Sequence, residues 1–218
     1  MKLLLTSSGL KNKEISNALF ELVGKEPKNT SLVFISTASN VEMGDKGWLI
    51  DDLLNFKKQG FKSIYITDMS AVGREIWLPQ LKQSDVICFS GGNENYLADI
   101  LEKNNAKKDF LELLQEKVYM GISAGSMVAG KFFDKEIINL LFPEEIYNGE
   151  NKTPLGLVDL GFIPHLNSDY FKALRVDKLE KMKADLGDNV YACDDETSLK
   201  IIDNKIEVIG TGIFWTTK

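Results

Sequence analysis

Short apolar, β-branched segments alternate with longer segments of helical periodicity along most of this chain. Strands that alternate with helices pair in parallel, because each helix carries the chain back across one face of the sheet. The alternation therefore predicts an α/β fold, with a mostly parallel sheet covered by helices on both faces. The expected strands are Lys2 to Thr6, Ser31 to Ser36, Ser63 to Thr67, Asp85 to Phe89 and Lys117 to Ile122.

Apolar residues recur at helical spacing between these strands. Gly60 closes one such segment, as glycine commonly does at the end of a helix. Two more helices are expected around the polar stretch Lys103 to Lys108, and a later one from about Tyr170 to Leu186. The positions with the clearest spacing are Ile15, Leu19 and Leu22, and then Leu49, Leu53 and Phe56.

The C-terminal part of the chain has a different pattern. Leu199 to Ile202 and Lys205 to Ile209 flank the dipeptide Asp203-Asn204, and two residues between two apolar runs suit a β-hairpin. This hairpin would add antiparallel strands at one edge. The sequence contains no repeat or Pro- or Gly-rich linker, so residues 1–218 are expected to form a single domain.

Composition excludes several classes of function. Lys and Arg number 26 against 32 Asp and Glu, a net charge of −6, without a basic and aromatic cluster, so nucleic acid is not an expected partner. No apolar run approaches the roughly 18 residues of a membrane span, and Met1 to Leu5 is too short for a signal peptide, so a cytoplasmic protein is expected. Cys88 and Cys193 form neither a CxxC pair nor a disulfide framework and are expected to be reduced.

The segment Gly121 to Gly125 reads G-x-S-x-G, with an apolar strand before it and a helix-compatible run after it. This context is typical of a nucleophile elbow, in which small flanking residues let a strand and a helix approach and expose the serine beyond the sheet edge. Ser123 is the candidate nucleophile, and the N–H of Ala124 is a candidate oxyanion donor. Ser126 is the competing serine, but it lies one turn into the helix, where its hydroxyl can bond to a carbonyl instead.

A second glycine-containing turn follows the neighbouring expected strand. Gly91 and Gly92 come directly after the apolar run Asp85 to Ser90, so their backbone N–H groups could face a ligand at the same sheet edge. The turn fits either the other half of an oxyanion hole or an anion cradle. Its spacing matches neither the P-loop nor G-x-G-x-x-G, which disfavours a nucleotide site.

His165 is the only histidine. A serine needs a positioned base, which in hydrolases of this kind is usually histidine, so His165 is the expected base. A site with several histidine ligands is excluded within one chain, and no metal or cofactor is expected. The segment Leu155 to Ile163 is expected to be a strand that ends just before Pro164 and His165, where such sheets place reactive groups.

A third group should orient the imidazole, and spacing alone leaves several acids open. Asp195 is the preferred choice, because its triplet follows the apolar run Val190 to Cys193 and precedes the hairpin, which places it at a strand end. The acids considered are Asp134, Glu136, Asp159, Asp169 and the triplet Asp194, Asp195 and Glu196.

Four segments together resemble the peptidase E and cyanophycinase family of serine peptidases, and the likeness extends over most of the chain. They are Ser90 to Tyr96 (SGGNENY), Gly121 to Ser126 (GISAGS), Pro164-His165 and Asp194 to Leu199 (DDETSL). The resemblance implies a class I glutamine amidotransferase-like, flavodoxin-like fold with serine in place of cysteine.

For individual residues the resemblance implies a nucleophile at Ser123, a base at His165 and oxyanion donors at Gly92 and Ala124. Alignment back from Ser198-Leu199 implies the acid at Asp195, whereas an acid soon after the nucleophile, as Asp134 stands here, has also been given this role in the family.

The resemblance also bears on the substrate. Peptidase E cleaves dipeptides that begin with aspartate, and cyanophycinase cleaves an aspartate-arginine polymer, so a cationic side chain is expected near the site. Of the two arginines, Arg74 and Arg175, Arg175 follows His165 by ten residues and is the candidate substrate-binding residue. Lysines such as Lys172 and Lys178 are the other nearby cations, and they lack the bidentate contact that arginine makes to a carboxylate.

The sequence thus predicts a serine-type peptidase that hydrolyses small peptides, as a dipeptidase or exopeptidase, through an acyl-enzyme. An esterase or acyltransferase with the same elbow is one alternative. A non-catalytic module that binds an anionic ligand is another. A homodimer is left open, as is the choice among Asp195, Glu196 and Asp134.

Overall fold

A computed structural model describes residues 1–145, 150 and 152–218. The strands are β1 (Lys2–Thr6), β2 (Ser31–Ile35), β3 (Ser63–Thr67), β4 (Val86–Phe89), β5 (Val118–Ile122), β6 (Gly161–Ile163), β7 (Val190–Cys193), β8 (Thr197–Ile202), β9 (Lys205–Gly210) and β10 (Phe214–Thr216). The α-helices are α1 (Lys13–Val23), α2 (Thr37–Asn40), α3 (Gly47–Gln59), α4 (Arg74–Gln83), α5 (Glu94–Lys103), α6 (Lys107–Leu113), α7 (Ala124–Met127), α8 (Lys135–Leu141), α9 (Val176–Lys181) and α10 (Lys183–Leu186).

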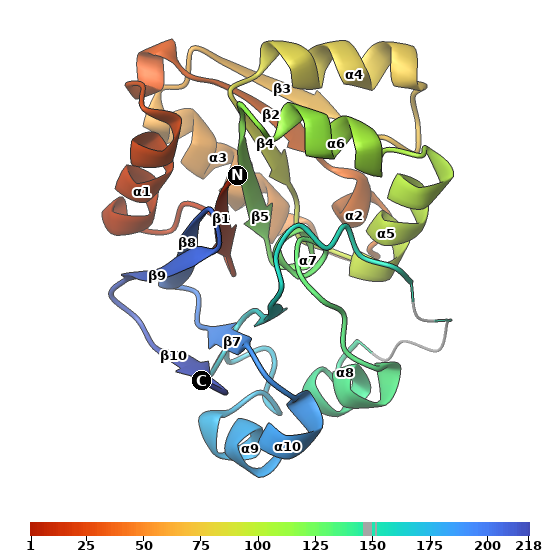
Figure 1. Cartoon of the computed structure of the whole chain (residues 1–218), viewed down its shortest axis with the longest axis vertical. Helices are drawn as coiled ribbons and strands as arrows, with labels where there is room; N and C mark the ends of the chain where they lie inside the picture. The colour runs from red at the N-terminus through yellow and green to blue at the C-terminus, as the bar shows by residue number, and fades with distance from the viewer. Residues whose placement is uncertain (146–149, 151) are drawn as a thin grey trace.

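The main sheet has the strand order β3-β2-β4-β5-β1-β8-β9 (Figure 1). Its first five strands are parallel, and β8 and β9 continue it antiparallel beside β1. The predicted parallel α/β sheet is confirmed, with the five expected strands in place to within one residue at each end. The C-terminal hairpin is confirmed as well, and both turn residues, Asp203 and Asn204, have positive φ angles of 47° and 69°, as a two-residue hairpin turn requires.

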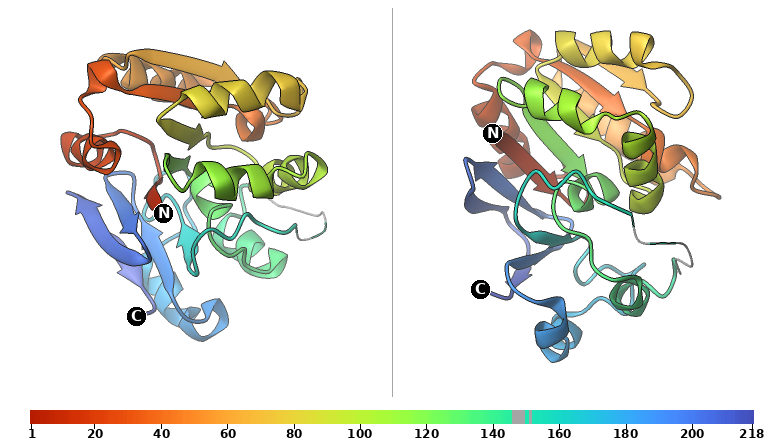
Figure 2. Two further views of the ribbon diagram at one scale, coloured as in Figure 1. Left: turned by 45° about the horizontal axis from the view of Figure 1, so that its top comes forward. Right: turned by 45° about the vertical axis from the view of Figure 1, so that its right-hand side comes forward.

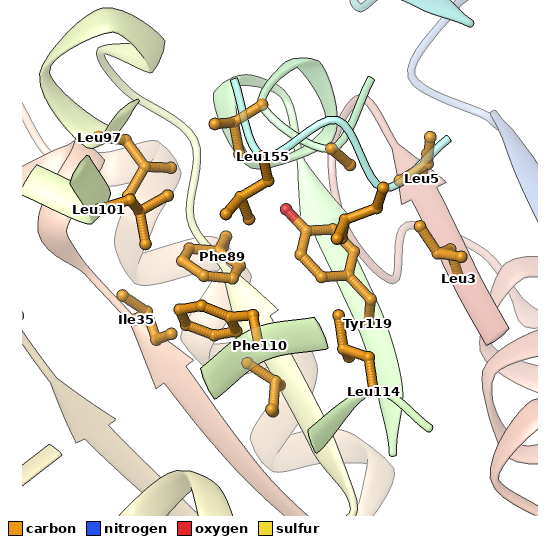
Figure 3. Packing of buried hydrophobic residues seen from close by; sticks show 14 of the residues in the cluster. Leu3, Leu5, Ile35, Phe89, Leu97, Leu101, Phe110, Leu114, Tyr119 and Leu155 are labelled. Carbon is orange, nitrogen blue, oxygen red and sulfur yellow. The ribbon is translucent and has the colours of Figure 1, made fainter. Parts of the chain in front are cut away.

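Side chains from the parallel strands alternate between two cores. Leu3 and Leu5 of β1 pack with helices α4, α5 and α6, whereas Leu4 between them packs with α1 and α3 on the opposite face. The period of two in a strand produces this division, and helices therefore cover both faces. Figure 3 shows the first core, where the ring of Phe89 lies against those of Phe110 and Tyr119 at centroid distances of 5.1 and 5.3 Å.

A second sheet, which the sequence patterns did not predict, lies beyond the carboxyl end of the main sheet, in the lower half of Figure 1 and in both views of Figure 2. Its strand order is β10-β7-β6. A smaller core lies between this sheet and helices α8, α9 and α10, and Trp215 and Leu179 are buried in it. These strands contain only three or four residues each, too few for a periodic signal in the sequence.

Two sequence predictions are wrong in this region. The expected strand from Leu155 to Ile163 is reduced to Gly161–Ile163. Gly156 adopts a φ of 60°, and the N–H groups of Leu155 and Leu157 donate to the carbonyl oxygens of the two residues that follow α7 instead of to a strand. These apolar residues are buried as an irregular segment.

The expected helix from about Tyr170 to Leu186 begins only at Val176 and is interrupted at Met182. Before this helix, the Phe171 ring stacks on the His165 ring at a centroid distance of 5.2 Å and meets the Phe142 ring edge to face at 5.1 Å. Arg175 is extended, with φ −133° and ψ 152°. Ring packing against the site therefore replaces the first turns of the expected helix.

Candidate active site

Ser123 lies at the turn between β5 and α7, with φ 47° and ψ −110°, a backbone conformation that residues with a side chain rarely adopt. Gly121 and Gly125 make this turn feasible. A Cβ at Gly121 would lie 2.6 Å from the backbone of Ser126, and one at Gly125 would lie 2.4 Å from the carbonyl oxygen of Phe89. The strand-turn-helix context expected for G-x-S-x-G is therefore present.

Ser126, the competing serine, is fully buried and anchors the turn to β1. Its Oγ donates to the Thr6 carbonyl at 2.8 Å and accepts from the Thr6 N–H at 2.9 Å. Ser123, by contrast, is partly exposed. The two serines have separate positions, one in the core and one at the surface of the site.

Gly92 follows β4 and adopts a φ of 121°. A Cβ here would lie 2.3 Å from the Ala38 carbonyl oxygen, so only glycine fits at this position without a clash. Within the described residues, the N–H groups of Gly92 and Ala124 donate to no backbone carbonyl. Both donors remain available to a ligand near Ser123.

Gly92→Ala is expected to lower the free energy of unfolding by about 2–4 kcal/mol, since it combines a backbone clash with a strained φ angle. Gly60→Ala is the matched control, because Gly60 also has a positive φ of 75° but has open space around its Cβ position. The control should cost only about 1 kcal/mol. Urea unfolding measures both, and equal losses would contradict the role given to the Ala38 contact.

His165 follows β6 and also has an unusual backbone, with a φ of 63°. Its N–H donates to Ser7 Oγ, which in turn donates to the Cys193 carbonyl, so the loop after β1 holds the histidine against the end of β7. Phe171 stacks on the imidazole. These contacts fix the direction of the ring.

Ser123, His165 and Asp195 form one continuous chain of hydrogen bonds. His165 Nε2 lies 3.0 Å from Ser123 Oγ, and His165 Nδ1 lies 2.7 Å from Asp195 Oδ1. Burial on its own raises the pKa of Asp195, but the hydrogen bond and charge of His165 outweigh it, with help from Ser8, and keep this pKa below its ordinary value. The carboxylate is therefore poised to stay ionised beside the imidazole.

The three acids of the triplet have different partners. Asp194 accepts the N–H groups of Glu196 and Ile213 and so shapes its own loop. Glu196 accepts from the Asn12 side chain, and only Asp195 contacts His165. Asp134 is exposed at the start of α8. Geometry within the described chain therefore favours Asp195.

The other predicted site residue, Arg175, directs its Nη1 to the carbonyl oxygens of Phe171 and Leu174, at 2.9 and 2.8 Å. It is not among the described residues that line the pocket in front of Ser123. Arg74 forms a bidentate pair with Asp109 on the far helices. Neither arginine supplies a free guanidinium at Ser123 in this arrangement.

An open pocket with a volume of about 40 Å³ lies in front of Ser123 and His165. Glu94 and Glu145 also line it, and its apolar wall consists of Met127, Ile138, Phe142 and Phe171. Sequence reasoning missed these residues and the Ser7-Ser8 loop. The rule that reactive groups gather at the carboxyl ends of parallel strands could have identified the loop after β1, but nothing in the sequence places α8 or Phe171 here.

In the part of the chain that the structure describes, no three His, Cys, Asp or Glu side chains are grouped to hold a metal ion. None of its helices combines the length and apolar character needed to cross a membrane.

A serine on a strained turn, beside a histidine hydrogen-bonded to a carboxylate, on an α/β sheet is the arrangement of a serine hydrolase. Comparison with known proteins defines the class further. The model of peptidase family S51 matches residues 3–209, and the chain belongs to this family of serine peptidases. The resemblance to peptidase E noted from the sequence is thereby confirmed.

Among curated proteins, the uncharacterized peptidase Lin0382 of Listeria innocua is 24% identical over 197 residues, which cover 81% of this chain and 87% of that protein. The uncharacterized peptidase Lmo0363 of Listeria monocytogenes is 31% identical over 96 residues, 44% of this chain and 46% of that protein.

Two solved structures share the fold. A Listeria monocytogenes EGD-e protein described as a peptidase E protein has a TM-score of 0.74 at 23% identity, covering 97% of this chain and 98% of that one. A peptidase from an acI-B1 actinobacterium has a TM-score of 0.69 at 22% identity, covering 100% and 90%. These likenesses confirm the peptidase E-like fold class.

Proposed function

We propose that this serine peptidase hydrolyses small peptides through an acyl-enzyme formed on Ser123, with His165 as the base and Asp195 as the acid that orients it. The observation that carries the proposal is the unbroken hydrogen-bond chain from Ser123 Oγ through both nitrogens of His165 to Asp195. Because Asp195 fixes Nδ1 as the protonated nitrogen, Nε2 has its lone pair directed at the serine hydroxyl.

In the first half of the reaction, Ser123 Oγ attacks the peptide carbonyl carbon while its proton passes to His165 Nε2. The tetrahedral intermediate then collapses, the C–N bond breaks, and the same proton passes to the leaving amine. In the second half, water attacks the ester carbonyl, gives one proton to Nε2, and Ser123 Oγ leaves and recovers that proton. Asp195 stays ionised throughout and stabilises the imidazolium.

Gly92 and Ala124 are proposed to stabilise the negative oxygen of both intermediates with their backbone N–H groups. Support comes from their positions at the ends of adjacent strands β4 and β5 and from the absence of backbone acceptors for them within the described residues. The N-terminal end of α7 adds only a small field, since the helix has four residues.

A small substrate is supported by the small cavity in front of Ser123, which has a volume of about 40 Å³ and is bounded by Phe142 and Phe171. The experiment compares the purified protein on a dipeptide library and on matched aliphatic esters. We expect peptide hydrolysis that a fluorophosphonate abolishes. Turnover of esters alone would identify an esterase, and binding of anions without turnover or labelling would identify a non-catalytic module; either result would contradict the proposal.

A further inference from the structure

The lining of the pocket in front of Ser123 includes two acidic residues, Glu94 and Glu145, and within its described lining there is no Lys or Arg. Since the proposed substrate must enter this space to reach Ser123, the charge of the lining acts directly on the substrate. An aspartyl side chain placed here would meet charges of its own sign. A cationic group would meet charges of the opposite sign.

Glu94 is the first residue of α5 and comes directly after the Gly92 turn. Its Oε1 accepts a hydrogen bond from the Asn95 side chain at 2.9 Å, and among the described residues it forms no ion pair with any Lys or Arg. Lys135 lines a smaller hollow beside Glu94 but does not come within ion-pair distance. An acid in the first turn of a helix is ordinarily solvated, whereas this one lies in a pocket.

The electrostatics of Glu94 indicate a missing positive partner. The pKa of Glu94 is raised to about 7, chiefly by burial; its own backbone N–H and Asn95 lower it, whereas the carboxylates of Glu145 and Glu42 raise it. The pKa of Glu145 is also raised, chiefly by burial and then by Glu42, whereas His165 lowers it. A bound cation would stabilise the ionised form of both carboxylates.

On the basis of the peptidase function above, we propose that Glu94 selects substrates that place a cationic group in this pocket, either a free α-ammonium or the ammonium or guanidinium of a basic side chain. The carboxylate receives the cation while Asn95 holds one of its oxygens in place. Glu145, in the same lining, adds electrostatic attraction. Selection thus comes from a carboxylate of this chain, in place of the cationic residue expected for aspartyl substrates.

The test uses two dipeptide pairs that differ by one charge, Lys-Ala against norleucine-Ala and Ala-Lys against Ala-norleucine, each with a free and an acetylated amino terminus. A charge-assisted hydrogen bond predicts a preference of about 10- to 100-fold in kcat/KM for the substrate that carries the recognised cation. This is the lysine over the norleucine peptide if the side chain is recognised, and the free over the acetylated amino terminus if the α-ammonium is recognised. Glu94→Gln, which keeps the shape and the Asn95 contact, should remove this preference. Glu102→Gln, an exposed acid on the same helix, is the matched control and should retain it.

The two sources of the cation give different results. Dependence on the lysine side chain identifies a basic residue, and dependence on the free amino terminus identifies the α-ammonium; both support the proposal when Glu94→Gln abolishes them. If the kcat/KM preference for the cationic substrate in Glu94→Gln stays within about twofold of the preference in wild type, the proposal is overturned.

The pH dependence offers a second readout. For a substrate recognised through its lysine side chain, which stays charged across this range, the preference in wild type should increase as pH rises through about 7 because the cation binds the ionised carboxylate, and Glu94→Gln should show no such change. A change in the rate of the catalytic step common to both members of a pair cancels in the ratio. Glu42, Glu145 and Lys135 are present in both proteins, so they do not account for a difference between them.

Binding without turnover separates this proposal from the peptidase function. By calorimetry, lysinamide should bind wild type about tenfold or more tightly than N-acetylnorleucinamide, which lacks both ammonium groups, and Glu94→Gln should remove the difference. Equal binding of the two amides to wild type would overturn the selectivity even if peptides are cleaved. Selective binding without fluorophosphonate labelling of Ser123 would instead contradict the proposed catalysis and leave the cation site supported.

Discussion

Ser123→Ala is expected to lower kcat for peptide hydrolysis by at least about 10⁴-fold and to abolish fluorophosphonate labelling, because it removes the only proposed nucleophile. The fold should survive, since Ser123 is partly exposed and its Oγ contacts His165 alone among the described side-chain hydrogen bonds. Residual hydrolysis would come from the oxyanion donors and from binding. Mass spectrometry of the labelled wild-type peptide locates the adduct.

Ser126→Ala is the control, because it removes a neighbouring hydroxyl of the same motif. Its loss leaves the Thr6 N–H without its partner, which should cost about 1–3 kcal/mol of stability but should preserve labelling at Ser123. If Ser123→Ala still reacted with the probe while Ser126→Ala did not, the two serines would have to exchange roles.

Asp195→Asn is expected to lower kcat by about 10³- to 10⁴-fold, since an amide can present its N–H to Nδ1 and leave the imidazole in the wrong tautomer. Asp134→Asn provides the decisive comparison, because Asp134 is the alternative acid and lies exposed at the start of α8. That variant should stay within about twofold of wild type. Single-turnover acylation rates for both variants measure the difference.

Stability against pH checks the same carboxylate independently of activity. The pKa of Asp195 in the folded protein lies below its ordinary value, so its contacts stabilise the fold fully above about pH 4 and lose this effect as pH falls through the folded pKa. The gap in unfolding free energy between wild type and Asp195→Asn should therefore shrink on acidification.

A large loss of activity in Asp134→Asn, with none in Asp195→Asn, would contradict the assignment of Asp195 as the acid that orients His165.

Much of the main sheet could be predicted from the sequence because its signals are local. Short continuous apolar runs in the strands and helical spacing of apolar residues in α1 and α3 depend only on near neighbours, and Gly60 indeed ends α3 with a φ of 75°. Apolar runs that end at Ile163 and Cys193 could be read from the sequence, but their pairing with Phe214–Thr216 in a second sheet could not, because strands of three or four residues carry no period. The helix expected from Tyr170 was shortened because Phe171 packs on His165, a contact that no local pattern reveals.

The sequence by itself determined the elbow around Ser123 and, through a single histidine, the identity of the only imidazole. Only the tertiary structure decided which acid meets that imidazole, since Asp195 and His165 are 30 residues apart in the chain, and the other acids of the triplet differ from Asp195 by one position. It also decided the charge of the pocket, where Glu94 faces the site and Arg175 bonds to its own loop. Spacing along a chain limits which residues are neighbours within an element, whereas contacts between elements depend on how loops fold and what they pack against.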